Sequence, residues 1–168
     1  YLEEGALRFE NNTVEANQGE GVYAQGAGLR IAGNTFRNQD GRALYLSGDG
    51  LTVQGNTLLS NRYGMEILGT GLIAGNIVSG TWGSNYTYPG ALILRGRADQ
   101  TAGQTFTVTG NLILRNRTIA NGGGIYAEGY RITFENNVIA FNHADGNGSG
   151  LYLAPHSGTP YRRYYYTL

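Results

Sequence analysis

The chain has 168 residues, a formal net charge of zero from 12 basic and 12 acidic side chains, and no cysteine. This length corresponds to one domain, the balanced charge leaves no basic stripe for a nucleic-acid partner, and the lack of cysteine excludes disulfides and thiolate metal sites. Glycine is abundant, with 28 residues. Because glycine and asparagine tolerate positive φ, this composition predicts many tight corners.

The two ends and the hydropathy of the chain carry less information. No apolar run approaches the roughly 20 residues of a membrane-spanning helix, so we expect no membrane insertion. The chain begins at Tyr1 without an initiator methionine or a signal peptide. We therefore expect a mature or trimmed piece of a longer protein.

A degenerate repeat runs through the chain. Each copy has an apolar–x–apolar stretch, a corner with asparagine and a second apolar stretch, as in LRIAGNTFRN from Leu29. The corner asparagine recurs after 22, 22, 20, 35 and 26 residues, and the 35-residue step indicates an insertion. The corner residues are Asn12, Asn34, Asn56, Asn76, Asn111 and Asn137.

A second asparagine follows in five of the six copies, and a further short strand such as GVYAQG or ALYLSG comes after it. The asparagines are explained either by side-chain ladders that satisfy buried corner backbone or by simple left-handed turns. Both explanations are structural. These second asparagines are Asn17, Asn38, Asn61, Asn116 and Asn142.

If each copy is one turn of a coil, equivalent residues lie above one another about 4.8 Å apart. Three columns are then wholly apolar and are predicted to face the core. They are Phe9, Ile31, Val53, Ile73, Val108 and Phe134; Val14, Phe36, Leu58, Val78, Ile113 and Ile139; and Val22, Leu44, Met65, Leu92, Ile125 and Leu151.

These columns predict an all-β fold, a right-handed single-stranded parallel β-helix of about six rungs without substantial helix. The domain spans residues 1–160, with rungs that start near residues 7, 29, 51, 72, 105 and 131. A leucine-rich repeat would show L-x-x-L-x-L spacing, and a left-handed β-helix would show a strict six-residue period. Neither pattern is present. A β-sandwich would not keep a period of 20 to 22 residues with matched columns, so this fold is excluded as well.

The repeat unit, seen in IAGNTF and VQGNTL, resembles the β-helix repeats of the pectin-lyase-like superfamily from about Leu7 to Leu153. The resemblance implies the fold and admits pectate lyases, polygalacturonases, alginate epimerases, phage tailspikes and non-enzymatic surface proteins. Phe9 to Asn12 and Phe134 to Asn137, with Gly122 to Ile125, are also similar to repeats of polymorphic autotransporter passengers. The other rungs lack these narrower signatures.

One outward column on the strand after the second asparagine is rich in tyrosine, and we call it the tyrosine strip. The favoured explanation of the strip is cross-strand stacking among the tyrosines themselves, which stabilises the sheet. Because aromatic faces also stack on sugar rings, binding of an extended glycan is the functional alternative, and docking of a protein is a third. The strip consists of Tyr23, Tyr45, Glu66, Ile93, Tyr126 and Tyr152.

The segments between the second asparagine and this strand vary most in length, so we expect them to project from one edge as binding loops. The longest is TWGSNYTYP. A second insertion, RGRADQTAG, follows Leu94. The loop residues added to the strip as ligand-binding candidates are Trp82, Tyr63, Tyr86 and Tyr88.

No catalytic constellation stands out. The superfamily resemblance implies clustered aspartates in hydrolases, or acidic calcium ligands beside an arginine base in lyases, and neither pattern is present. His143 and Asp145 are candidates for an acid–base pair, with Arg62 and Glu66 as further catalytic candidates. The spacing after Asp145 lacks the glutamate of a calcium loop, so we expect no metal and no cofactor.

The tail, residues 161–168 (YRRYYYTL), is rich in tyrosine and arginine, which are enriched at interfaces. We expect it to fold back over the last rung as a cap; an adhesive strand that pairs with another chain and the stub of a longer protein are the alternatives. The sequence favours a non-catalytic extracellular or cell-surface module with a structural, adhesive or assembly role. Its expected partners are a polysaccharide, or protein chains bound through the tail or the uncapped ends. A polysaccharide lyase, epimerase or glycosidase fragment is the alternative.

Overall fold

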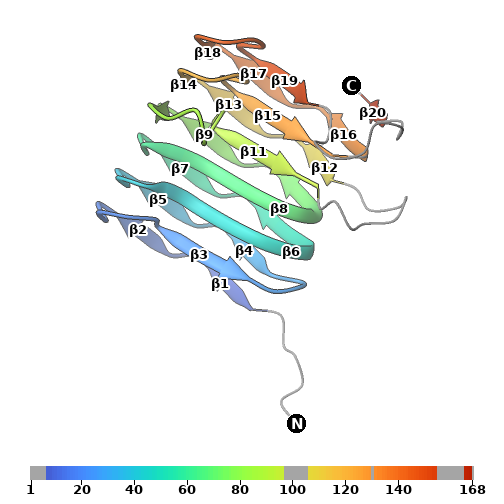
Figure 1. Cartoon of the computed structure of the whole chain (residues 1–168). Coiled ribbons are helices and arrows are strands. Elements are labelled where there is room, and N and C mark those ends of the chain that lie inside the picture. The colour runs from blue at the N-terminus through green and yellow to red at the C-terminus, as the bar shows by residue number, and fades with distance from the viewer. Residues whose placement is uncertain (1–6, 97–105, 130, 155–164, 168) are drawn as a thin grey trace.

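The computed structural model describes residues 7–96, 106–129, 131–154 and the backbone of 165–167. In these residues there are twenty strands, stacked in successive rungs (Figure 1), and no helix. Consequently none of the described segments is a helix long and apolar enough to cross a membrane.

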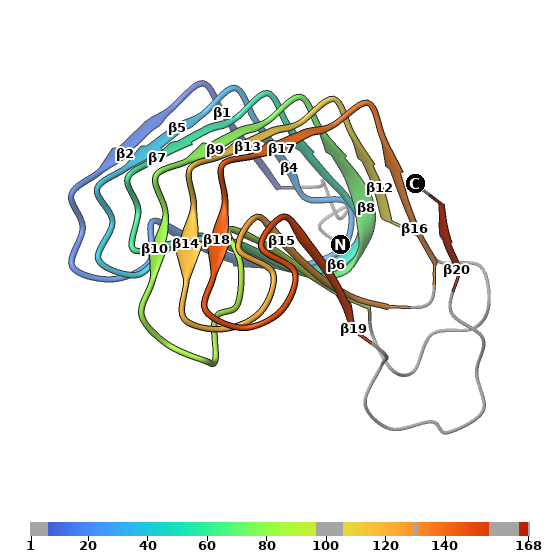
Figure 2. The ribbon, with the colours of Figure 1, turned by 90° about the horizontal axis from the view of Figure 1, so that it is seen from above.

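Three parallel sheets form the walls of the coil and surround one core (Figure 2). The largest sheet holds β1 (Arg8–Glu10), β3 (Val22–Gln25), β4 (Arg30–Ala32), β6 (Arg42–Gln54), β8 (Tyr63–Ala74), β11 (Leu92–Arg95), β12 (Phe106–Thr109), β15 (Ile125–Glu128), β16 (Arg131–Glu135), β19 (Leu151–Ala154) and β20 (Tyr165–Thr167). The second sheet holds β2 (Thr13–Glu15), β5 (Thr35–Arg37), β7 (Thr57–Leu59), β9 (Ile77–Ser79), β13 (Leu112–Leu114) and β17 (Val138–Ala140). The third holds β10 (Trp82–Gly83), β14 (Arg117–Thr118) and β18 (His143–Ala144).

The predicted apolar columns are confirmed. Ile31 pairs in register with Phe9 and Val53, Phe36 with Val14 and Leu58, and Leu44 with Val22 and Met65. The same columns continue to the last rung. Their inner members are buried, whereas Phe9, Val14, Val22, Ile139 and Leu151 in the first and last rungs are only partly buried. The chain is therefore a parallel β-helix with a continuous apolar core.

The corner asparagines form a ladder along the coil. The backbone N–H and Nδ2 of Asn56 donate to Oδ1 of Asn76 at 2.9 and 3.0 Å, and Nδ2 also donates to the carbonyl oxygen of Ile31 at 2.9 Å. Oδ1 of Asn56 in turn accepts from the backbone N–H and Nδ2 of Asn34, each at 3.0 Å. The pattern repeats at every rung. A buried corner is thus satisfied by side-chain amides instead of water.

The second ladder corrects one prediction, because Asn38 does not belong to it. Gln39 takes that place, and its Oε1 accepts from the backbone N–H and Nδ2 of Asn17 at 3.2 and 2.9 Å. Asn38 lies beside it with φ of 57°, as a left-handed turn residue. Thr81 fills the position in the fourth rung, and its buried hydroxyl has no hydrogen-bond partner among the described residues.

The 20-residue step between the corner asparagines Asn56 and Asn76 arises because one residue is lost at each of two corners. Paired residues are 22 apart at Thr35–Thr57 and 21 apart at Leu44–Met65. After a register shift beyond Gly48 they are 20 apart, as at Thr52–Leu72. A Cβ on Gly48 would collide with the carbonyl oxygen of Gly26 in the rung before it. The backbones of this corner stack so closely that only glycine fits.

Part of the tail continues the coil. The backbone of β20 pairs in parallel with β16, with Arg131 opposite Tyr165 and Thr133 opposite Thr167. β20 therefore covers the outer edge of β16. Residues 161–164 and 168 of the tail, and 97–105 of the second insertion, lie outside the described residues.

Replacing Asn56 by leucine should lower the free energy of unfolding by about 3–5 kcal/mol, because the Ile31 carbonyl and the Asn34 N–H lose buried partners. Chemical denaturation measures the effect. Asn12→Leu in the exposed first rung is the matched control and should cost about 1 kcal/mol or less. Equal losses at both positions would contradict a buried ladder.

Replacing Thr81 by asparagine should raise stability by about 1 kcal/mol. The new Nδ2 can reach the carbonyl oxygen of Leu58, as Asn61 reaches that of Phe36 and Asn116 that of Val78. Thr81→Val, which removes the unpartnered hydroxyl, should be neutral or slightly stabilising. A marked loss of thermal stability in Thr81→Val would show that the hydroxyl has a partner.

Candidate functional site

The tyrosine strip is in register but does not face outward along its whole length. Tyr23 pairs with Tyr45, Tyr45 with Glu66, Ile93 with Glu66 and Tyr126, and Tyr126 with Tyr152. The expectation of a continuous outward column is wrong in the middle, where Ile93 is only 1 % exposed and Glu66 only 8 %. The strip is therefore divided into two tyrosine pairs.

Both tyrosine pairs stack on themselves. The ring centroids of Tyr23 and Tyr45 lie 4.7 Å apart with 15° between their planes, and those of Tyr126 and Tyr152 lie 5.6 Å apart with 25°. The guanidinium of Arg42 lies 4.3 Å from the ring of Tyr45, and that of Arg95 lies 5.3 Å from the ring of Tyr126. Because the rings contact each other and arginine, their faces do not form one open platform for a sugar chain.

Alternating charges run alongside the strip. Arg42 bonds to Glu20 and Glu66, and Arg95 bonds to Glu66 at 3.0 Å and to Glu128 at 3.1 Å. The side chains of Arg42, Glu66 and Glu128 are largely buried. Such buried carboxylates need these partners. Glu66, a catalytic candidate from the sequence, thus has one guanidinium on each of its two oxygens.

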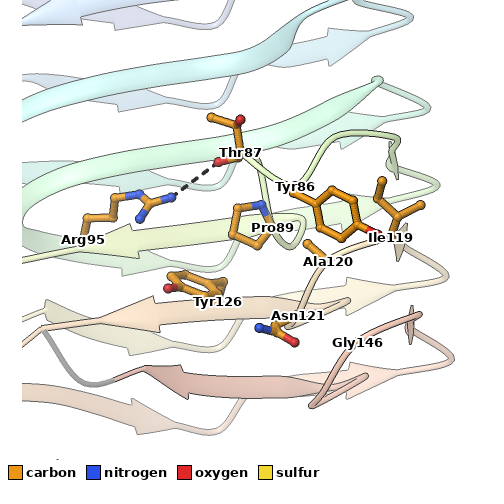
Figure 3. Close-up of a pocket in the computed structure, with 9 residues that line it drawn as sticks. All are labelled: Tyr86, Thr87, Pro89, Arg95, Ile119, Ala120, Asn121, Tyr126 and Gly146. Carbon is orange, nitrogen blue, oxygen red and sulfur yellow. Dashed lines mark hydrogen bonds between the residues drawn. The ribbon is translucent and has the colours of Figure 1, made fainter. Parts of the chain in front are cut away.

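The longest loop folds back over the middle of the strip. The ring of Tyr88 packs against that of Tyr63 at 4.8 Å and lies 5.0 Å from the guanidinium of Arg42. Arg95 Nη2 donates to the carbonyl oxygen of Thr87 at 3.5 Å (Figure 3). Tyr63, predicted to project from the edge, is therefore buried at 8 % exposure, and Tyr88 is half-buried. Trp82 and Tyr86 remain exposed, at 62 % and 75 %.

A cavity of about 470 Å³ lies between this loop, the strip and the following rungs (Figure 3). Aromatic and apolar walls come from Tyr86, Pro89 and Tyr126, and polar groups come from Arg95 and Asn121. Asn121 is held in place because its Oδ1 accepts from the backbone N–H of Asn147 at 2.7 Å. Thr87, Ile119, Ala120 and Gly146 complete the lining.

A family model described as a right-handed beta helix region matches residues 1–160. The chain belongs to the right-handed β-helix family. This match also confirms the predicted hand of the coil. Comparison with curated proteins and with solved structures finds no match.

The right-handed β-helix does not bring the four catalytic candidates together. His143 Nε2 lies 2.9 Å from Asp145 Oδ1, and Arg117 lies 3.5 Å from the same oxygen, but His143 and Asp145 are 58 % and 42 % exposed. Neither lines the cavity, whereas Arg62 lines a separate groove beside Trp82. No group of three His, Cys, Asp or Glu side chains suited to a metal ion occurs in the described part of the β-helix.

Sequence reasoning missed Arg95 and Asn121 as site residues. Arg95 ends the strand ALILR, and its partner Glu128 ends the paired strand of the next rung. Glu and Arg alternate at nearby positions of successive repeats, and that alternation was the available signal. Asn121 carried no signal, because its place depends on how two loops stack.

Stability should fall above the ordinary tyrosine pKa of 10.0, because burial, aided by the charge of Glu128, raises the pKa of Tyr126. The unfolded chain then releases this proton at lower pH than the native chain. The contribution of Tyr126 to stability is fully present below pH 10.0 and is lost as the pH rises through the raised pKa of Tyr126 in the folded chain. Burial acts in the same direction on the pKa of Tyr45.

Melting temperatures measured from about pH 9 to 11 check this expectation. Tyr126→Phe should lose less stability over this range than the parent chain. Tyr86→Phe, at an exposed ring, is the control and should follow the parent. Identical curves for the parent chain and Tyr126→Phe would contradict the assignment.

Proposed function

We propose that this β-helix is a non-catalytic module that binds a glycan in the cavity beneath Tyr86. The observation that carries the proposal is the composition of the cavity wall, where the rings of Tyr86 and Tyr126 meet the polar groups of Arg95 and Asn121. Ligand sites combine apolar or aromatic surface with a few fixed polar groups. A sugar ring has both an apolar face and hydroxyls, so it matches this wall.

The polar groups of the cavity suit hydroxyl ligands. Three N–H groups of Arg95 are taken by Glu66, Glu128 and Thr87, which leaves its remaining guanidinium N–H groups as donors for a ligand. The Oδ1 of Asn121 holds Asn147, and its Nδ2 has no hydrogen-bond partner among the described residues. The Tyr126 hydroxyl both donates and accepts. Sugar hydroxyls do the same, so each polar group has a partner in a bound glycan.

The ion pairs support binding without turnover. A general acid or base must be free to exchange a proton with the substrate, but Glu66 is bonded to Arg42 and Arg95, and Glu128 to Arg95. The rigid coil with loops on one edge suits a structural or adhesive role. Because a polysaccharide ligand would be found outside cells, we propose that the module lies in the extracellular space or on the cell surface.

A polysaccharide lyase, epimerase or glycosidase is the second candidate, favoured by the 2.9 Å contact of His143 with Asp145. Incubation with acidic and neutral polysaccharides separates the two proposals. A rise in unsaturated-uronate absorbance or in reducing ends that disappears in His143→Ala would overturn the non-catalytic one.

Replacing Tyr86 by alanine should weaken glycan binding by about tenfold or more, because the variant removes one wall of the cavity. Tyr86 is 75 % exposed, so stability should hardly change. Affinity electrophoresis in gels that contain soluble polysaccharides measures the effect.

Tyr23→Ala is the matched control for this experiment. Tyr23 is 57 % exposed and belongs to the tyrosine strip but not to the cavity. It should bind as the parent chain does. Unchanged binding in Tyr86→Ala, together with a loss in Tyr23→Ala, would move the site from the cavity to the strip.

A further inference from the structure

A second outward column follows the edge that β10, β14 and β18 form (Figure 2). Trp82 pairs in register with Arg117, and Arg117 with His143. Asp40 and Arg62 continue the column towards the N-terminus. Like the backbone N–H of Trp82, which donates to a carbonyl oxygen of the preceding rung at 3.3 Å, their backbone N–H groups donate to carbonyl oxygens of the preceding rung, at 3.0 and 2.9 Å. One polar or aromatic side chain thus lies at this edge in each of five successive rungs.

The middle of this column lines an open groove of about 500 Å³. Asp40, Arg62 and Trp82 come from three successive rungs, which span about 10 Å along the axis, and Ser84 lies beside them. Buried Gln39 and Asn61 form its base. The base is rigid because both residues are members of the second ladder.

The indole of Trp82 is an unoccupied aromatic surface. It is 62 % exposed, and no ring or guanidinium of the described residues stacks on it. The tyrosines of the strip differ from Trp82 because they stack in pairs, and Tyr45 and Tyr126 also lie against an arginine. A large exposed aromatic beside fixed polar groups is typical of a binding site.

The polar groups of the groove are available as well. Arg62 forms no ion pair in the described part of the chain. Its Nη2 donates to Ser84 Oγ at 3.3 Å, and its guanidinium carbon lies 5.6 Å from the ring centre of Tyr63, which leaves other N–H groups for a ligand. Asp40 likewise pairs with no described cation and is exposed. The groove therefore offers an acceptor, Asp40, and a donor, Arg62, in adjacent rungs.

We infer that the groove of Asp40, Arg62 and Trp82 is a second binding site, which takes a neutral sugar of a glycan chain. The indole would stack on the ring, Arg62 would donate to hydroxyls and Asp40 would accept from them. One positive and one negative side chain cancel, so a charged sugar gains no net attraction. This site is independent of the cavity beneath Tyr86, with which it shares no lining residue.

Affinity electrophoresis with hydroxyethyl cellulose, galactomannan and laminarin as neutral probes, and with polygalacturonate and alginate as acidic ones, tests the inference. For at least one neutral probe, Trp82→Ala should weaken binding about tenfold or more, while Trp82→Phe keeps it within about threefold. Asp40→Asn and Arg62→Gln should each weaken it several-fold, because each removes a charge-assisted bond. The three positions are exposed, so the four variants remove no core contact. Thermal unfolding of each variant verifies its fold.

Two results would overturn the inference directly: no neutral probe is bound, or Trp82→Ala binds the neutral probes as the parent chain does. It would also be overturned if the parent chain binds only the acidic probes and Asp40→Asn binds them more tightly. Tyr86→Ala separates this site from the cavity. Binding that is lost in Trp82→Ala and kept in Tyr86→Ala supports the groove and contradicts the cavity. The opposite result supports the cavity and contradicts the groove, and loss in both variants supports both sites.

Discussion

The fold depends on the amide ladders at its corners. A coil of short strands turns sharply several times per rung, and each turn buries backbone groups that no strand partner reaches. Asn34, Asn56 and Asn76 satisfy these groups, each bonding to the rung on either side. A half-satisfied network of this kind would cost more than an apolar one. The ladder therefore holds every rung to the same register, and the apolar columns follow.

A fixed register also determines what the outside can do. Each position of the repeat becomes a row of side chains about 4.8 Å apart, so one substitution per rung is enough to build a chain of charges or a groove. In one row, Arg42 and Arg95 alternate with glutamates and stack on Tyr45 and Tyr126. The charges of this row are therefore paired. In the row at the other edge, Arg62 and Trp82 are left open to solvent.

The two proposed sites differ in how they are built. The cavity beneath Tyr86 exists because an inserted loop folds back, and Arg95 holds that loop through the carbonyl of Thr87. The groove beside Trp82 needs no insertion, since the second ladder forms its base. Rigid backbone under a site keeps its polar groups in place without an ordering cost on binding. Both sites thus derive their rigidity from the stacked coil.

The sequence by itself determined the parallel coil, the three core columns and the places of the corner asparagines, because period and residue type repeat in every rung and depend only on neighbours one turn away. The tertiary structure decided that these asparagines form a ladder, since their amides bond to the rungs on either side. Matching by residue type missed that Gln39 and not Asn38 belongs to the second ladder. The ladder position lies five residues after the corner asparagine in every rung, and a glutamine amide fills it here. Nor did the sequence determine that Ile93 and Tyr63 are buried. The tertiary structure decided the burial of Tyr63, because the inserted loop packs the ring of Tyr88 against Tyr63 and Arg42 and bonds to Arg95 through Thr87. No repeat encodes these contacts.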